Sequence, residues 1–324
     1  MGVYHLMGLG RSPGTVTGPL SYLTHRYQRW NEDDERFFAR SGEREHRQRG
    51  EKVSDVQALI LFTTQEILNG QVLTYGYTDN PPGQIATGPE QDGGPMKEVL
   101  QRLLRREWPG IAKGRQKGDV FWCEIDRRDI RDVYDKVVQV VAALAWVGGQ
   151  GKEMWVNLTG GNNVTNFALE LAANLSGEVA RLYYVQAENQ DAERCARFTA
   201  ENGYWVELPV MPLALGRLTL TILEMLDQEP MSTSTIYSRS RNEYYDLIRG
   251  VDSEETLMEE YLRPMWKQGL IAETERGYVV GPQWALIRPY QERLEEVQQK
   301  PSTIEKLAQE KPWIERERIN LEVR

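Results

Sequence analysis

The sequence is poor in the residues that build metal sites and disulfide frameworks. It has only two cysteines, Cys123 and Cys195, and three histidines, His5, His25 and His46. A structural zinc site or a disulfide framework needs such residues in closely spaced sets, and these are scattered along the chain. We therefore expect no metal and no cofactor.

Long apolar runs are also missing. A membrane-spanning helix needs about 18–20 consecutive apolar residues, and the longest candidate, residues 137–147, is much shorter. The N-terminal stretch MGVYHLMGLG lacks the basic flank of a signal peptide. We expect a cytoplasmic protein that has no membrane partner.

Positive charge is in deficit, with 39 basic against 48 acidic residues and a net charge of −9. A surface of this sign does not attract nucleic acid or an anionic membrane as a whole, so a phosphate ligand would have to be held by local geometry. The 324 residues leave room for two domains, or for one large domain with an appendage.

Apolar runs of strand length alternate with longer helical patterns up to about residue 210. This alternation is typical of an α/β domain with a mostly parallel sheet covered by crossover helices. The predicted strands are 3–10, 58–64, 119–125, 154–159, 181–185 and 204–208, and the predicted helices are 16–30, 96–108, 130–147 and 164–175.

The predicted helix over 164–175 has the clearest pattern. Its apolar residues recur at helical spacing and predict one stripe that packs against the sheet. The stripe consists of Val164, Phe167, Ala168, Leu171, Ala172 and Leu175. Two insertions, the charged segment 31–54 and the Gly/Pro-rich segment 76–95, are either lids or simply variable surface loops.

After residue 211 the pattern changes to helix 218–226, a Ser/Thr-rich segment 231–240, helix 254–268 and two short strands around Arg276–Gly277. That order is typical of a winged helix-turn-helix. We predict an α/β domain over 1–210, a winged helix-turn-helix domain over 211–287 and a helical C-terminal arm over 288–324. Prolines 289, 301 and 312 are expected to break this arm, which would pack on the body or on a partner subunit.

The segment GLGRSPGTVTGP, residues 8–19, follows the first predicted strand. Its glycines allow a tight turn, and its Ser, Thr and Pro residues favour the start of a helix. Free amides at a helix start, together with hydroxyl groups, favour an anion such as phosphate. The candidate site residues here are Gly10, Arg11, Ser12, Pro13, Thr15 and Thr17.

The segment VNLTGGNNVTNFAL, residues 156–169, joins the fourth predicted strand to the clearest helix. Thr159, Gly160 and Gly161 form a turn with exposed amides, and Asn162 or Asn163 can cap the helix and offer an amide to a ligand. Any strand-to-helix turn needs a glycine and a cap, so each segment alone has a purely structural explanation. Two such segments at the carboxyl ends of strands favour a ligand site.

Two other enzyme classes fit less well. The glycines at 8, 10 and 14 give G-x-G-x-x-x-G instead of G-x-G-x-x-G, and the second strand ends in Thr63-Thr64-Gln65 without an acid for a ribose. A nicotinamide-dependent enzyme is therefore an alternative only. A serine hydrolase would need G-x-S-x-G and a partner histidine, which the sequence does not offer.

The pair LGRSPGTVT and NLTGG resembles the CARF domain, the Rossmann-like sensor of CRISPR-associated proteins that binds cyclic oligoadenylate. With the winged helix, residues 1 to about 285 are similar to CARF–winged-helix proteins, which include ring nucleases and transcription regulators. The resemblance implies a homodimer whose two copies of these loops face each other and hold a ring, most simply cyclic tetra-adenylate. It implies a metal-independent ring nuclease that switches off type III antiviral signalling, or a non-enzymatic regulator that responds to the ring.

The resemblance also implies individual roles. Arg11, Ser12 and Thr15 would lie near phosphate or ribose, and residues 159–162 would hold the ring. Many members read T-G-G-T-K, with a lysine where this chain has Asn163, which cannot neutralise the charge that develops during cleavage. Arg11 is then the nearest cation, and other candidates are Arg105, Arg106, Lys113, Arg115 and Lys117.

The predicted winged helix does not look like a strong DNA reader. Residues 217–282 hold seven basic and twelve acidic residues, and phosphate contacts supply most of the affinity of such domains. We expect it to serve dimerisation or to shape the ligand pocket, so DNA is disfavoured as a partner. The aromatic residues that would mediate contact are Tyr237, Tyr244, Tyr245 and Tyr261, with Trp266 expected in the domain core instead.

Overall fold

The computed structural model describes residues 2–38, 55–78, 91–112, 115–145, 153–187, 196–197, 203–210, 215–300 and 302–321. Most of the two insertions considered as lids, and also Lys113, Cys195 and His46, lie outside these ranges. The chain divides into two compact units, residues 1–212 with 297–324 and residues 213–296.

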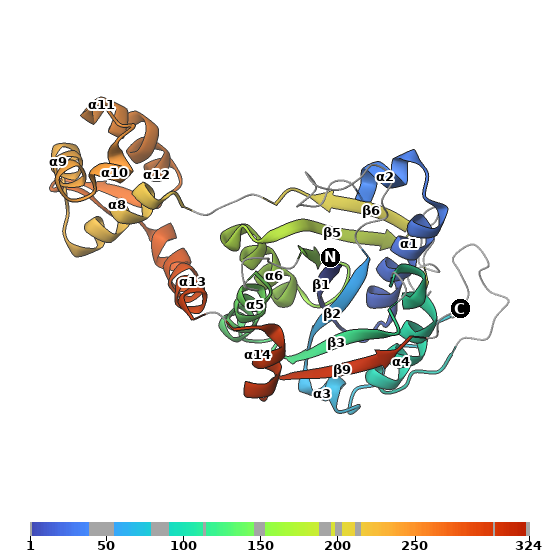
Figure 1. The fold of residues 1–324 in the computed structure, drawn as a ribbon. Coiled ribbons are helices and arrows are strands. Elements are labelled where there is room, and N and C mark those ends of the chain that lie inside the picture. The colour runs from blue at the N-terminus through green and yellow to red at the C-terminus, as the bar shows by residue number, and fades with distance from the viewer. Residues whose placement is uncertain are drawn as a thin grey trace. The chain divides into compact units, whose positions relative to one another are not determined.

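The first unit is an α/β fold built on a seven-stranded sheet with the order β6-β5-β4-β1-β2-β3-β9 (Figure 1). The four neighbouring pairs from β5 to β3 are parallel, and the two edge strands β6 and β9 pair antiparallel. The strands are β1 (Val3–Gly8), β2 (Val56–Thr63), β3 (Lys117–Glu124), β4 (Glu153–Asn157), β5 (Val179–Ala187), β6 (Gly203–Leu208) and β9 (Ile314–Asn320). The six strands predicted from the sequence are all present.

Helices cover both faces of this sheet (Figure 1). Apolar residues of α1 and α4 pack with Val3 and Met7 of β1 in one core, and α5 and α6 pack together against the opposite face. The helices are α1 (Gly14–Arg29), α2 (Glu32–Phe38), α3 (Gln65–Leu68), α4 (Met96–Glu107), the 3-10 helix η1 (Trp108–Ile111), α5 (Ile130–Ala145), α6 (Asn163–Ser176) and α14 (Ile304–Glu310).

The apolar stripe of α6 differs from the predicted one. Ala168, Ala172 and Leu175 are buried as expected. Phe167, however, is 55% exposed, and Val164 and Leu171 are only partly buried. The neighbouring positions Leu169 and Ala173 are buried in their place, so the buried stripe is rotated by about one position around the helix. An apolar face of α6 therefore remains open.

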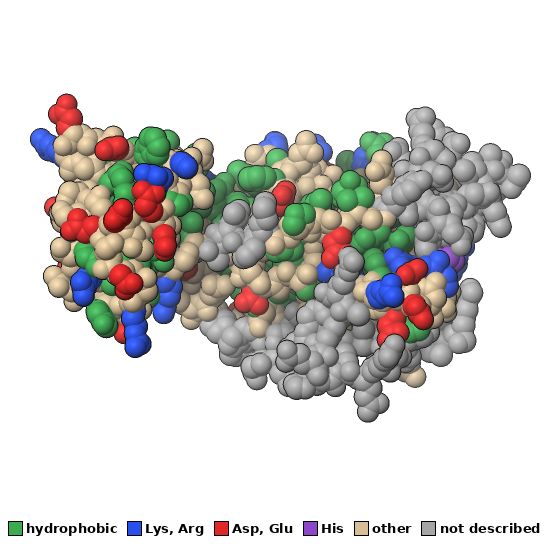
Figure 2. Space-filling model, turned by 90° about the horizontal axis from the view of Figure 1, so that it is seen from above, with side chains coloured by type: hydrophobic (Ala, Val, Ile, Leu, Met, Phe, Trp, Pro, Cys, Tyr) green, Lys and Arg blue, Asp and Glu red, His purple; other side chains and the backbone are tan. Residues whose placement is uncertain are grey.

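The second unit has its own apolar core, to which Ile222, Ile236, Leu257 and Met265 contribute. Met231 forms an isolated antiparallel bridge with Tyr278 at the edge of the two-stranded ribbon. Acidic side chains are spread over the visible face of this unit (Figure 2). Its elements are α8 (Arg217–Gln228), α9 (Thr233–Glu243), α10 (Tyr245–Ile248), α11 (Glu254–Leu257), the π-helical turn η2 (Met258–Leu262), α12 (Arg263–Lys267), strands β7 (Ile271–Thr274) and β8 (Gly277–Val280), and most of α13 (Pro282–Gln299).

The prediction of a purely helical C-terminal arm is wrong, because the segment also contains a strand. Pro289 lies inside α13 without ending it, and β9 completes the sheet of the first unit by pairing with β3. The sequence IERERIN looks like a solvated helix, but its charges have partners on β3. Arg316 forms two hydrogen bonds of 2.9 Å with the Asp119 carboxylate, and Trp122 donates to Glu317 at 2.8 Å.

The exposure of Trp266 also differs from the prediction. It was expected in the core of the small domain, but its side chain is 52% exposed. The core positions of the same helical segment are taken by Leu262 and Met265, one turn and one residue earlier. Trp266 therefore leaves about half of its side chain in solvent, although it belongs to the same helical segment as these core residues.

Candidate functional site

The sheet changes direction between β1 and β4. From β1 the chain proceeds outward through β2 and β3, crosses over to β4 on the other side of β1, and continues outward through β5 and β6. In open α/β sheets, ligands bind at such a switch point, beyond the carboxyl ends of the strands. The loop between β1 and α1, residues 9–13, and the loop between β4 and α6, residues 158–162, both lie there. The structure thus brings the two predicted segments together.

The two loops touch through glycine backbone. A Cβ atom added to Gly8 would lie 2.8 Å from the Cα of Gly161, and one added to Gly160 would lie 2.6 Å from the carbonyl oxygen of Gly8. Gly161 also has a φ of +83°, which side chains rarely tolerate. Glycine is required here because the loops approach each other more closely than any side chain permits.

Asn157, at the end of β4, ties the two loops together and was not among the predicted site residues. Its carboxamide oxygen accepts from the amide of Thr159 at 2.8 Å, and its Nδ2 donates to the carbonyl of Thr15 at 3.4 Å. The side chain is fully buried. An asparagine that ends an otherwise apolar strand was the available signal, because a buried amide needs several partners.

The second loop has a rigid base and an exposed tip. The Thr159 hydroxyl accepts from the amide of Val185 at 2.8 Å, and Asn162 caps α6 by accepting from the amide of Thr165 at 2.8 Å. Asn162 is therefore the helix cap, one of the two residues that the sequence proposed for this role. Gly161 and Asn163 are exposed at the tip, where a ligand can reach them.

The first loop starts α1 without a side-chain cap, so the first amides of this 16-residue helix have no side-chain partner at the cap position Pro13. Thr15 donates its hydroxyl to the Ser12 carbonyl at 2.9 Å. Ser12 and Gly10 are partly exposed. Thr17 is different, because it is fully buried and its hydroxyl donates to the Pro13 carbonyl at 3.1 Å. Its hydroxyl supports the helix start and does not face the loop surface.

Arg11 is exposed on the first loop, and two residues of the segment after α3 hold its side chain in place. Its Nε donates to the carbonyl of Leu73 at 2.9 Å, and its guanidinium carbon lies 4.2 Å from the ring centre of Tyr75. It is the predicted cation that the structure brings to the switch point. The N-terminal ends of two helices are nearby, and helix dipoles favour an anion such as phosphate at such ends.

The basic residues near the start of β3 do not reach this site. Arg115 pairs with Asp55 at 2.9 Å, next to the beginning of β1. In a parallel sheet the beginnings of the strands lie at the opposite edge from their carboxyl ends, so Arg115 and Lys117 are far from the loops. Arg106 pairs with Glu107 at 2.7 Å. The prediction that one of these residues compensates for Asn163 has no support in the geometry of the described residues.

A second polar feature lies in the body of the sheet. His5 of β1 is buried, its Nδ1 is 2.8 Å from the hydroxyl of Tyr183, and its Nε2 has no partner among the described residues. Burial, together with the smaller effect of the Arg181 charge, lowers the pKa of His5 to about 3. Arg181 is itself buried and pairs with Glu207 at 2.6 Å. His5 therefore stays neutral in the folded protein.

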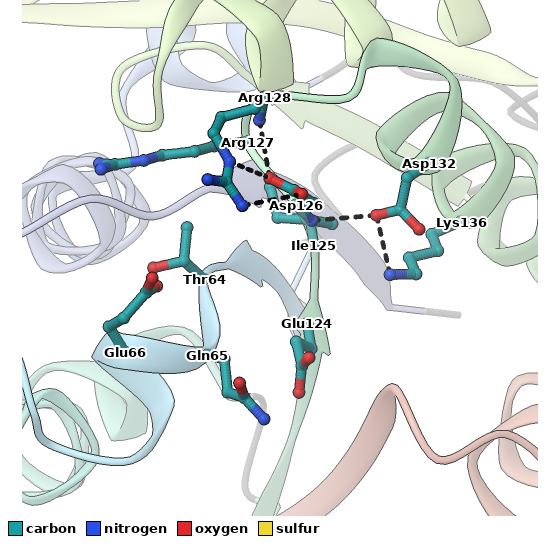
Figure 3. Close-up of a pocket in the computed structure, with 10 residues that line it drawn as sticks. All are labelled: Thr64, Gln65, Glu66, Glu124, Ile125, Asp126, Arg127, Arg128, Asp132 and Lys136. Carbon is teal, nitrogen blue, oxygen red and sulfur yellow. Dashed lines mark hydrogen bonds and ion pairs between the residues drawn. The ribbon is translucent and has the colours of Figure 1, made fainter.

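A pocket of about 270 Å³ opens at the same edge of the sheet as the two loops, beyond the carboxyl ends of β2 and β3 (Figure 3). Two of its cations are paired with carboxylates, since Arg128 contacts Asp126 at 3.1 Å and Lys136 contacts Asp132 at 2.8 Å. Asp132 also accepts from the amide of Asp126. This pocket is therefore less suited to binding an anion than the switch point is.

Two further observations concern other kinds of site. Within the described ranges, no three His, Cys, Asp or Glu side chains gather in a way that could hold a metal ion. None of the helices described here combines the length and the apolar character needed to cross a membrane.

Comparison with known proteins gives two matches. Residues 114–190 match the family described as "HFX_2341_N:-like, N-terminal". An uncharacterized protein of Archaeoglobus fulgidus is 24% identical over 236 residues, which cover 67% of this chain and 71% of the archaeal protein. The family match covers β3, α5, β4, α6 and β5, and therefore includes the second loop of the switch point.

Proposed function

We propose that this protein is a homodimer that binds cyclic oligoadenylate, in particular cyclic tetra-adenylate, at the β1–β4 switch point and cleaves it without a metal ion. The observation that carries the proposal is the direct backbone contact between the loops around Gly8 and Gly160. It joins two helix starts, an exposed arginine and hydroxyl groups into one surface, as the resemblance to CARF domains implies.

The surface suits a phosphodiester ring better than a single phosphate. α1 and α6, of 16 and 14 residues, both begin at the two loops. Their positive ends favour negative charge. Arg11 and the exposed Asn163 lie on different loops, so they can contact different phosphates or riboses. A second copy of the surface, across a two-fold axis, would complete the enclosure of a ring.

The proposed reaction is an in-line transesterification. The ribose 2′-oxygen attacks the adjacent phosphorus and loses its proton, the bond to the 5′-oxygen breaks, and the 5′-oxygen takes up a proton. The product carries a 2′,3′-cyclic phosphate and a 5′-hydroxyl. Ser12 would position the phosphate or the attacking hydroxyl, and Arg11 would stabilise the developing charge. Because Asn163 is neutral, we expect slow turnover.

The dimer is supported by the open face of α6. Val164, Phe167 and Leu171 lie on the helix that begins at the second loop, and Phe167 is 55% exposed. Substituting Phe167 by glutamate should weaken the dimer by a factor of about ten or more, because it replaces a buried aromatic contact by a buried charge. Sedimentation velocity over a dilution series measures this, with Phe167→Leu as the apolar control. An unchanged dimer in the glutamate variant would exclude this face.

The second unit is proposed to be a winged helix that serves dimerisation. Its helices, the bridge at Met231 and the β7–β8 ribbon follow the winged-helix order. Two of its basic residues are engaged internally, since Arg239 contacts Glu243 at 3.1 Å and Arg263 contacts Glu259 at 2.7 Å. The exposed aromatic residues Tyr245 and Trp266 fit a protein contact better than DNA.

The decisive experiment is incubation of the purified protein with cyclic tetra-adenylate in the presence of EDTA, under single-turnover conditions. We expect conversion to linear products that end in a 2′,3′-cyclic phosphate. Binding without conversion would remove the enzymatic part, and absence of binding would remove the whole proposal.

The regulator alternative is tested by titrating promoter DNA at low and moderate salt, with and without the ring. The winged-helix order is the observation that favours it. A ligand-dependent change in DNA affinity together with an intact ring would favour the regulator. A nicotinamide-dependent enzyme would instead bind NADH and change its fluorescence.

A further inference from the structure

Tyr75 is an exposed aromatic residue fastened to the first loop of the switch point. Its side chain is 56% exposed. Its backbone amide donates to the carbonyl of Arg11 at 2.9 Å, and Arg11 in turn donates from Nε to the carbonyl of Leu73 at 2.9 Å. The guanidinium lies 4.2 Å from the centre of the Tyr75 ring. Three interactions therefore fix the ring next to the loop.

The residues on either side of Tyr75 hold it in place. Thr74 is buried. Its amide donates to the Gly94 carbonyl at 3.0 Å, and its hydroxyl accepts from the Gly94 amide at 3.0 Å. Tyr77 is also buried and pairs with Gln91. These hydrogen bonds anchor the backbone both before and after Tyr75. Tyr75 is presented by a fixed backbone.

An exposed, preorganised aromatic ring beside a phosphate-binding surface has a clear chemical use. Bases stack on aromatic side chains in proteins that bind single-stranded nucleotides, and this stacking contributes to affinity whatever the base. One side of the Tyr75 ring carries the Arg11 guanidinium. The bond to Leu73 uses only Nε of Arg11, so the terminal guanidinium nitrogens remain as donors for a phosphate.

We propose that Tyr75 is the platform on which one adenine of the ring stacks, while Arg11, held against the same ring, contacts the phosphate next to that adenine. This inference rests on the proposed function, and it assigns base recognition to a residue outside both loops. It makes Tyr75 a specificity residue, because a purine offers a larger stacking surface than a pyrimidine. Its hydroxyl has no part in the contact.

The test measures the affinity for cyclic tetra-adenylate by calorimetry in three variants. Tyr75→Ala should weaken binding about tenfold or more, because that is the range of one lost stack. Tyr75→Phe should bind as the unmodified protein does. Leu286→Ala removes another exposed apolar side chain, 65% exposed, in the second unit and should have no effect.

The outcomes separate this inference from the proposed function. If the unmodified protein does not bind the ring, the proposed function fails. If it binds and Tyr75→Ala binds equally well, only the platform fails. Tyr75→Ala could also act merely by releasing Arg11 from its position. The affinity of this variant would then depend less steeply on salt concentration than that of the unmodified protein, because a phosphate contact has been lost. The platform predicts an unchanged salt slope, so a shallower slope would overturn it.

Discussion

Replacing Gly160 by alanine is expected to force the two switch-point loops apart. The added Cβ would lie 2.6 Å from the carbonyl oxygen of Gly8 and 2.7 Å from the Cβ of Thr15. Both neighbours belong to the end of β1 and the first turn of α1, which cannot move without disturbing the core. Overpacking of this kind costs about 1–3 kcal/mol of unfolding free energy. For a domain of this size, each kcal/mol corresponds to roughly 2–4 °C in melting temperature.

The same substitution should lower the affinity for the ring about tenfold or more, because the loops then no longer share one surface. Thermal unfolding and calorimetry measure the two effects. Gly10→Ala is the matched control, since a Cβ at Gly10 meets nothing within 4 Å and its φ is not positive. In the thermal unfolding measurement this control should be neutral or slightly stabilising. Equal behaviour of the two variants would show that the contact between the loops does not matter.

Acidification is expected to destabilise the protein through His5. Its pKa is about 6.5 in the unfolded chain and is lowered to about 3 by burial in the folded protein. Between these values the unfolded chain binds a proton that the folded chain does not. Stability that is complete above pH 6.5 is therefore lost as the pH falls, by about 1.4 kcal/mol for each pH unit.

Denaturant unfolding at several pH values between 7 and 4 measures this slope, and the comparison with His5→Gln isolates the histidine from the carboxylates that also titrate. The glutamine variant should show a shallower slope. Tyr183→Phe removes the hydroxyl that contacts His5 at 2.8 Å but keeps the imidazole buried. This variant should be less stable overall and keep most of the slope. A glutamine variant with the full slope would contradict the linkage.

The parallel sheet could be predicted because its strands are short apolar runs between turn residues. The run 58–64 corresponds to β2 at Val56–Thr63, and the segment 154–159 corresponds to β4 at Glu153–Asn157. The two loops could also be predicted to be neighbours, since glycine-rich turns follow strands whose carboxyl ends share one edge. These features are local, and they do not depend on distant partners.

The remainder depends on contacts between distant residues. β9 is a strand because Arg316 meets Asp119 and Glu317 meets Trp122, and the sequence of the segment itself does not reveal those partners. Thr17 is buried because α1 turns it inward, although its residue type suits a phosphate site. Asn157 ties the loops by a contact that only the folded sheet creates.

The second unit is inserted into the first, because residues 213–296 lie between strands β6 and β9 of one sheet. A ribosome must therefore finish the inserted unit before it can release the strand that closes the sheet beside β3. Until then β3 has an unpaired backbone edge next to the large apolar side chains of Phe121 and Trp122. The nascent chain thus carries an incomplete sheet through most of its synthesis, which is when such edges are prone to aggregate.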